Sequence, residues 1–179
     1  LCPAAQVVCV EKSPEAYVYL EKNTRLALKG RGGSTENVLD ASPFEEPAFD
    51  WGMKPTRAAE PVEGDLFTYW ESLPESQLDL IVSNPPYVPQ SDLAAMHANV
   101  RGYEPPEALF VPDDDALRFY RAIARAGRRM LRPGGKLYFE IYERSAGQMR
   151  LLLGEEGYTD TEVREDLNGK PRMVCSRMK

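Results

Sequence analysis

The pattern of apolar and polar positions along the chain predicts alternating strands and helices. Short apolar or β-branched runs have the length of strands, and between them apolar residues recur at the spacing of amphipathic helices. Strands are expected at 7–10, near Val62, and at 78–82, 136–141, 160–163 and 172–178, and helices from Pro14 to Gly30 and at 116–131 and 145–156. Such alternation predicts an α/β domain with a mainly parallel sheet.

Local signals mark several ends of these elements. Ser13 is a suitable N-cap, and Pro14 suits the first helical position. Pro133-Gly134-Gly135 is expected to end the helix before the strand at 136–141. Asn168-Gly169 lies between the last two strands, which predicts an antiparallel hairpin at the sheet edge. The run of acids at 113–115 precedes a predicted helix, so we interpret it as capping and assign no metal site.

Residues 31–61 interrupt this pattern. The segment is rich in Pro, Gly, Ser and Glu, and only 37–39 resembles a strand fragment. We interpret it as a long surface loop or insertion that is mobile and tolerates shortening. A chain of 179 residues is otherwise the size of one domain, so we expect a single domain over 1–179.

The composition of the chain disfavours several classes of protein. Apolar residues make up 42% and charged residues 28% of the chain, as in globular proteins. The sequence has no apolar run long enough to predict a membrane-spanning helix. The net charge of −6 disfavours direct binding to nucleic acid over the whole surface.

The cysteines and the histidine restrict the chemistry. The three cysteines show no Cys-x-x-Cys spacing and too low a density for a secreted disulfide scaffold, which favours a reducing cytoplasm. The chain has one histidine, His97, which excludes most metal sites and disfavours Ser-His-Asp or Cys-His catalysis. We expect His97, Trp51 and Trp70 to be packing or surface residues.

Asn84-Pro85-Pro86-Tyr87 is the most specific chemical signal. It follows the apolar strand 78–82, and open α/β sheets bind ligands beyond the carboxyl ends of their strands. The Asn84 side-chain oxygen and the Pro85 carbonyl can accept the two N–H groups of a planar amide or amino group, while the Tyr87 ring packs on its face. The alternative interpretation is a rigid turn that ends a strand.

The chain resembles the HemK/PrmC family, the protein-(glutamine-N5) methyltransferases of peptide-chain release factors. The resemblance runs from Val7 to Met178 without the loop, and its segments are 10–16, 63–67, 79–89, 103–105, 115–121, 131–135, 140–141 and 166–172. Asn-Pro-Pro-Tyr alone is shared with adenine-N6 DNA methyltransferases. Tyr103-Glu104-Pro105 and the segment 115–121 favour the release-factor family.

The resemblance implies a Rossmann-like class I methyltransferase fold, with S-adenosylmethionine bound across the carboxyl edge of the sheet. Glu11, at the end of a strand, would accept hydrogen bonds from both ribose hydroxyls, because a carboxylate offers only acceptors. Asp65 and Leu66 would contact the adenine ring. Asn84 would contact both cofactor and substrate.

The implied reaction methylates the glutamine amide nitrogen in the Gly-Gly-Gln loop of a release factor. Asn84, Pro85 and Tyr87 would be the catalytic residues, and with Pro86 they would bind the substrate. Two alternatives stay open: an adenine-N6 methyltransferase acting on DNA or RNA, and a fragment without activity. Glu140, at a strand end, is either a structural carboxylate or part of the cofactor pocket.

The sequence departs from the family at its start. Family members have a strand and a glycine-rich loop just before the region where this chain begins, and a small helical N-terminal domain before that. Neither is found in these 179 residues, so we expect the chain to be the carboxyl part of a catalytic domain. The loop at 31–61 is also longer than the family implies, and Ser145 stands where members tend to have Gln.

Overall fold

The computed structural model describes residues 7–28, 59–73, 75–76, 78–95 and 105–179. The chain divides into two compact units, residues 1–66 and 67–179. Among the described residues, no helix has the length and apolar character needed to cross a membrane.

The first unit is a β–α–β arrangement. Strand β1 (Val7–Glu11) pairs in parallel with β2 (Ala59–Glu63), and helix α1 (Pro14–Leu28) connects them in sequence. The predicted cap is confirmed, because the Ala16 N–H donates to Ser13 Oγ at 3.2 Å. Strand β2 begins at Ala59, two residues before the expected end of the loop at Pro61. The rest of that loop, including the possible strand fragment 37–39 and Trp51, lies outside the described residues. The expected helix end at Gly30 also lies outside them.

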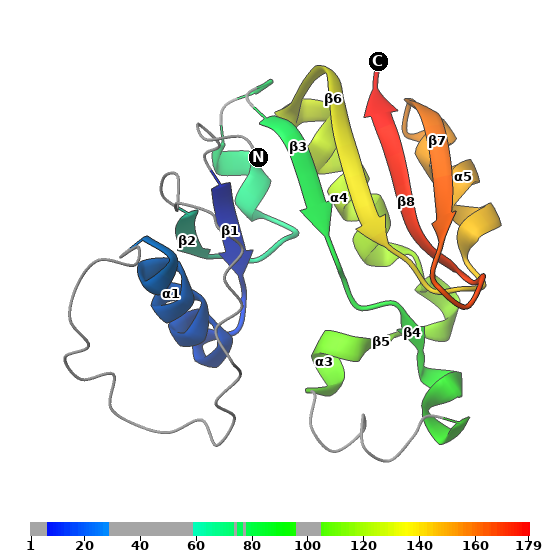
Figure 1. The fold of residues 1–179 in the computed structure, drawn as a ribbon, viewed down its shortest axis with the longest axis horizontal. Coiled ribbons are helices and arrows are strands. Elements are labelled where there is room, and N and C mark those ends of the chain that lie inside the picture. Colours follow the sequence, from blue (N-terminus) through cyan, green and yellow to red (C-terminus); the bar gives the residue numbers. More distant parts are fainter. Residues whose placement is uncertain (1–6, 29–58, 74, 77, 96–104) are drawn as a thin grey trace. The chain divides into compact units, whose positions relative to one another are not determined.

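The second unit contains a four-stranded sheet. Its order is β3 (Leu78–Ser83), β6 (Leu131–Glu140), β8 (Pro171–Met178) and β7 (Tyr158–Glu165), as Figure 1 shows. Strands β3 and β6 are parallel, whereas β8 is antiparallel to both β6 and β7. The antiparallel pairings of the described strands therefore all involve β8, which forms the predicted C-terminal hairpin with β7 around Gly169 at φ +73°.

Strand β6 starts earlier than the sequence predicts. Leu131 lies opposite Leu78 and Lys136 opposite Leu80, so residues 132–135 form a bulge within the strand. Gly134 takes a left-handed φ of +79° in this bulge, a conformation that glycine adopts without strain. The helix already ends at Met130, so Pro133-Gly134-Gly135 lies within the strand and does not end the helix as predicted.

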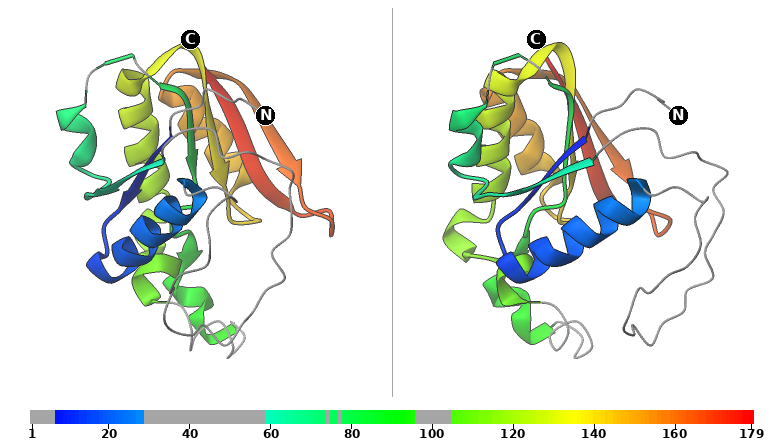
Figure 2. Two further views of the ribbon diagram at one scale, coloured as in Figure 1. Left: turned by 60° about the vertical axis from the view of Figure 1, so that its left-hand side comes forward. Right: turned by 90° about the vertical axis from the view of Figure 1, so that its left-hand side faces the viewer.

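Helices α4 (Arg118–Met130) and α5 (Ala146–Glu155) cover the same face of this sheet (Figures 1 and 2). Alternate residues of β6 follow this arrangement: Leu137 and Phe139 are buried against the helices, whereas Tyr138 and Glu140 on the other face are only half-buried. Among the apolar residues of β3, Ile81 alone is buried. Leu80 and Val82 are exposed, because β3 is an edge of this sheet and both helices lie on its opposite face.

The start of α4 also differs from the prediction. The acids 113–115 form a 3₁₀ turn, η3 (Asp113–Asp115), and the helix begins at Arg118 rather than at residue 116. No side chain caps the helix at Leu117. Instead, Asp113 Oδ1 accepts hydrogen bonds from the Ser91 N–H at 3.0 Å and from Ser91 Oγ at 2.8 Å. The acid therefore holds a different segment, the 3₁₀ helix η2 (Gln90–Ala95).

Gly127 allows α4 to approach β7 closely. A Cβ atom at Gly127 would lie 2.3 Å from the hydroxyl of Tyr158, which is buried and donates to the Ala124 carbonyl at 2.8 Å. We expect Gly127→Ala to lower the free energy of unfolding by about 1–3 kcal/mol. Urea unfolding measures the change.

Gly147→Ala in α5 is the matched control, because a Cβ there meets no atom within 4 Å. It should leave stability unchanged or raise it by up to about 1 kcal/mol, since alanine favours helices over glycine. Equal effects of the two substitutions would contradict the close approach at Gly127.

Short elements follow β3 at its carboxyl end. Strand β4 (Val88–Pro89) pairs in parallel with β5 (Phe110–Val111), and helix α3 (Pro106–Leu109) precedes β5. In Figure 1 these elements lie beyond the carboxyl ends of β3 and β6. A further 3₁₀ helix, η1 (Tyr69–Ser72), lies between the start of this unit and β3.

Candidate functional site

Asn84-Pro85-Pro86-Tyr87 occupies the predicted place, directly after the parallel strand β3. The four residues form an extended connection from β3 to β4. Pro85 is buried and Asn84 is exposed. The Tyr87 N–H donates to the Leu109 carbonyl at 3.2 Å, which ties the connection to the end of α3.

A cavity of about 590 Å³ opens beside this connection. Its lining comes from the ends of β3 and β6, the start of β8, the loop after β6, and the elements that follow β3. The residues are Asn84, Pro85, Pro86, Tyr87, Val88, Asp92, Ala108, Leu109, Glu140, Tyr142, Glu143, Arg144 and Arg172. The second unit therefore brings all four predicted substrate-binding residues to one pocket, at the sheet edge where open α/β folds bind ligands.

Tyr87 has a defined orientation in this pocket. Its hydroxyl donates to Glu140 Oε1 at 2.8 Å, and its ring stacks on Tyr142 with centroids 6.4 Å apart. Burial, and secondarily the hydrogen bond to Glu140, raises the pKa of Tyr87 above its ordinary value. The hydroxyl is therefore a neutral donor near pH 7. Glu140, for which the sequence left two roles open, is a half-buried carboxylate that lines this pocket.

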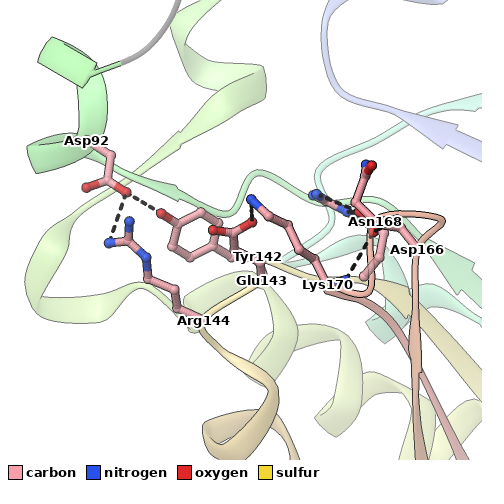
Figure 3. A network of polar contacts seen from close by, with 8 residues as sticks. Asp92, Tyr142, Glu143, Arg144, Asp166, Asn168 and Lys170 are labelled. Atoms are coloured by element: carbon pink, nitrogen blue, oxygen red, sulfur yellow. Dashed lines mark hydrogen bonds and ion pairs between the residues drawn. The ribbon is translucent and has the colours of Figure 1, made fainter.

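Polar side chains that the sequence did not single out form one wall of the pocket (Figure 3). The Tyr142 hydroxyl donates to Asp92 Oδ2, and Arg144 Nη1 lies 3.9 Å from the same oxygen. Lys170 Nζ lies 2.6 Å from Glu143 Oε2. Asp92 belongs to η2, so its two contacts join η2 to the loop after β6. Lys170 supports the same loop from outside the lining of the pocket, through its ion pair with Glu143. The sequence signals were that Lys170 stands within the resemblance segment 166–172 and that the other residues lie close to the segments 79–89 and 140–141.

The hairpin turn between β7 and β8 is fixed by Asp166. Its Oδ1 accepts the N–H of Asn168 at 2.8 Å and of Lys170 at 3.1 Å. Arg172 Nη2 lies 3.4 Å from its Oδ2. The turn thus holds Arg172 at the pocket.

Acidification should release this turn. The backbone hydrogen bonds from Lys170 and Asn168 lower the pKa of Asp166 below its ordinary value. A depressed folded-state pKa gives a contribution that is complete above the ordinary Asp pKa of about 3.9 and is lost as the pH falls through the lower folded-state pKa. NMR titration of these two amide protons should show a midpoint below about 3.9. Asp166→Asn should abolish the titration, and a midpoint at or above the ordinary value would contradict the assignment.

Three predicted cofactor-binding residues lie in the first unit. Glu11 ends β1, and its Oε1 accepts the Ser13 N–H at 2.8 Å, which orients the carboxylate. Asp65 follows β2 and lies 2.7 Å from Lys12 Nζ, an ion pair that the sequence did not predict. Leu66 comes next and is half-buried. A half-buried, acceptor-only carboxylate at the carboxyl end of a parallel strand fits a ribose diol.

The other residues considered in the sequence form no site in the described part of the chain. Trp70 packs edge-on against Tyr69, with ring centroids 5.8 Å apart. No group of three or more His, Cys, Asp or Glu residues that could hold a metal ion occurs among the described residues. His97 lies outside them.

Comparison with curated proteins identifies release factor glutamine methyltransferases as relatives of this chain. No family model matches the chain. A release factor glutamine methyltransferase of Geobacter sulfurreducens is 36% identical over 179 residues, which cover 98% of this chain and 51% of that protein. One of Bacteroides thetaiotaomicron is 48% identical over 112 residues, 63% of this chain and 40% of that protein. The chain thus spans about half the length, or less, of these curated relatives.

Among solved structures, a release-factor-specific protein-(glutamine-N5) methyltransferase of Alicyclobacillus acidocaldarius is 17% identical and covers 99% of this chain and 81% of its own, with a TM-score of 0.44. The sequence relatives, rather than this structure, carry the assignment. Together with the order of strands and helices, they confirm the predicted Rossmann-like class I methyltransferase fold. Over the part that it spans, this chain belongs to the HemK/PrmC family of release factor glutamine methyltransferases.

Proposed function

We propose that the protein transfers a methyl group from S-adenosylmethionine to the glutamine side-chain nitrogen in the Gly-Gly-Gln loop of a peptide-chain release factor. The observation that carries the proposal is the pocket of about 590 Å³ built around Asn84-Pro85-Pro86-Tyr87 in a chain with these relatives. A substrate that acts on the ribosome would place the reaction in the cytoplasm.

The substrate amide would be held by acceptors on one side and a ring on another. Its NH₂ group has two donors, and the Asn84 side-chain oxygen and the Pro85 carbonyl can each accept one. Pro86 contributes no N–H, so this stretch of backbone offers the substrate acceptors rather than competing donors. Tyr87, whose hydroxyl is already bonded to Glu140, would pack its ring on the amide plane.

Alignment is the main contribution that this site can make. An amide nitrogen is a poor nucleophile, because its lone pair is delocalised into the carbonyl. The cofactor supplies a methyl group activated by a sulfonium. Asn84 and Pro85 would aim the nitrogen for in-line displacement, and Tyr87 would fix the plane. Because positive charge disperses as the methyl is transferred, the site needs a dry pocket rather than a strong base, and the proton can leave afterwards.

The cofactor roles are proposed residue by residue. Glu11 would accept hydrogen bonds from the ribose hydroxyls, and the Ser13 N–H on its Oε1 would keep the carboxylate oriented. Asp65 and Leu66 would contact the adenine ring. Asn84 would contact the cofactor as well as the substrate.

The test uses the full-length gene product, S-adenosylmethionine and a release factor. Mass spectrometry should find one added methyl group on the glutamine of the Gly-Gly-Gln loop and none when that glutamine is replaced by alanine. An adenine-containing oligonucleotide serves as the competing substrate. Methylation of the oligonucleotide in place of the release factor would reject the proposal in favour of an adenine-N6 methyltransferase.

A further inference from the structure

Tyr87 and Tyr142 form a wall between two cavities. The second cavity measures about 350 Å³ and is lined by Tyr87, Pro89, Ser91, Asp92, Ala116, Leu117, Tyr120, Tyr142, Arg144, Ser145 and Gln148. Both tyrosines line this cavity and also the pocket that holds Asn84. Asp92 and Arg144 also line both spaces, so the two rings share this boundary with one acidic and one basic side chain.

The ring of Tyr87 is held in this wall by contacts from three directions. Its backbone N–H donates to the Leu109 carbonyl, and its ring stacks on Tyr142 at an interplanar angle of 25°. Neither contact fixes the far end of the ring. The far end is fixed by the hydrogen bond that the hydroxyl donates to Glu140 Oε1 at 2.8 Å. This acceptor lies on the side of the Asn84 pocket, because Glu140 lines that pocket.

Glu140 is itself anchored in the sheet. It ends β6, which pairs with β3 on one side and β8 on the other. Its carbonyl accepts the hydroxyl of the buried Tyr120 at 2.9 Å, and the N–H of the next residue, Ile141, donates to the Arg172 carbonyl at 2.9 Å. The backbone that carries the carboxylate is therefore fixed at the edge of the pocket.

We propose that Glu140 is a positioning residue: through the Tyr87 hydroxyl, its carboxylate holds the ring as a wall between the two cavities and so sets the plane on which the substrate amide packs. The effect on turnover rests on the proposed function. The effect on the ring does not.

Loss of the acceptor has two consequences. The half-buried Tyr87 hydroxyl loses its acceptor and keeps only the Arg172 guanidinium beside it, which has no acceptor to offer. This loss costs free energy unless the ring moves to find another acceptor. A moved ring no longer defines the amide plane, and misalignment of this kind lowers kcat. Contacts with the cofactor ribose, assigned to Glu11, do not involve Glu140.

A double-mutant cycle on methyl transfer tests the link. Glu140→Ala and Tyr87→Phe should each lower kcat by about ten-fold, with the KM for S-adenosylmethionine unchanged. Because both remove the same hydrogen bond, the double variant should be no slower than either single one. Glu140→Gln should restore most of the activity, since its amide oxygen still accepts the hydroxyl. Multiplied effects in the double variant, or no rescue by glutamine, would overturn the proposal.

A second measurement does not depend on activity. With ¹³C-labelled tyrosine, the ring signals of Tyr87 are identified by their absence in Tyr87→Phe. They should shift in Glu140→Ala, but stay in place in Glu140→Gln and in Glu162→Ala, a control carboxylate exposed on β7. Unchanged signals in Glu140→Ala would overturn the positioning role. A shifted ring in a protein that does not methylate a release factor would support the positioning role and reject the proposed function.

Discussion

Methyl transfer should fall by about 10²–10³-fold when Asn84 is replaced by alanine, the size of effect seen when one preorganised hydrogen-bonding group is removed from an active site. The substitution removes the proposed acceptor for one of the two N–H groups of the substrate amide. The stability of the fold should not change, because Asn84 is exposed and contributes no apolar side chain to the core. Steady-state kinetics on a release factor and thermal unfolding measure the two quantities.

Two further variants sharpen this test. Asn84→Gln keeps the amide but moves it outward by one methylene, so it should also lose turnover if the position of the acceptor is what counts. Asn23→Ala makes the alanine change at an exposed position of α1 and should leave turnover unchanged. Near-normal turnover of Asn84→Ala would show that the amide is held by other groups and that the clamp is assigned wrongly.

The order of elements could be predicted because the signals for it are local. The β-branched run before Ser13-Pro14 gave a strand and a helix start, and Asn168-Gly169 gave the hairpin. The predicted boundaries were wrong where the pairing between distant strands sets the start of an element. The pairing of β6 with β3 extends the strand back to Leu131 across a glycine bulge, which no local pattern distinguishes from a stop.

Some residues of the candidate site could likewise be predicted from a local motif, and others could not. Asn84, Pro85 and Tyr87 are adjacent in sequence and end an apolar strand, so one motif identified them. Their neighbours Glu140 and Arg172 come from β6 and β8, which the sheet topology places side by side. Sequence spacing carries no record of that pairing.

Asp92, in the 3₁₀ helix η2, illustrates the same limit. It lies five residues after Tyr87, yet its hydrogen-bond partner Tyr142 is 50 residues further along the chain. An acid in a polar segment looks like a solvated charge. Only the folded chain shows that it closes one wall of the pocket.

Leu153→Ala should lower the free energy of unfolding by about 2–5 kcal/mol, a large share of the roughly 5–15 kcal/mol that stabilises a typical domain. Leu153 has an exposed fraction of 0% on the face of α5 that packs on the sheet, so alanine leaves a cavity as well as losing buried apolar surface. Leu151→Ala makes the same change two residues away on the same helix, where the side chain is 68% exposed, and should alter stability by no more than about 0.5 kcal/mol. Helix propensity changes equally in both variants, so the difference between their urea midpoints isolates burial. Similar midpoints would mean that α5 does not pack on the sheet through Leu153.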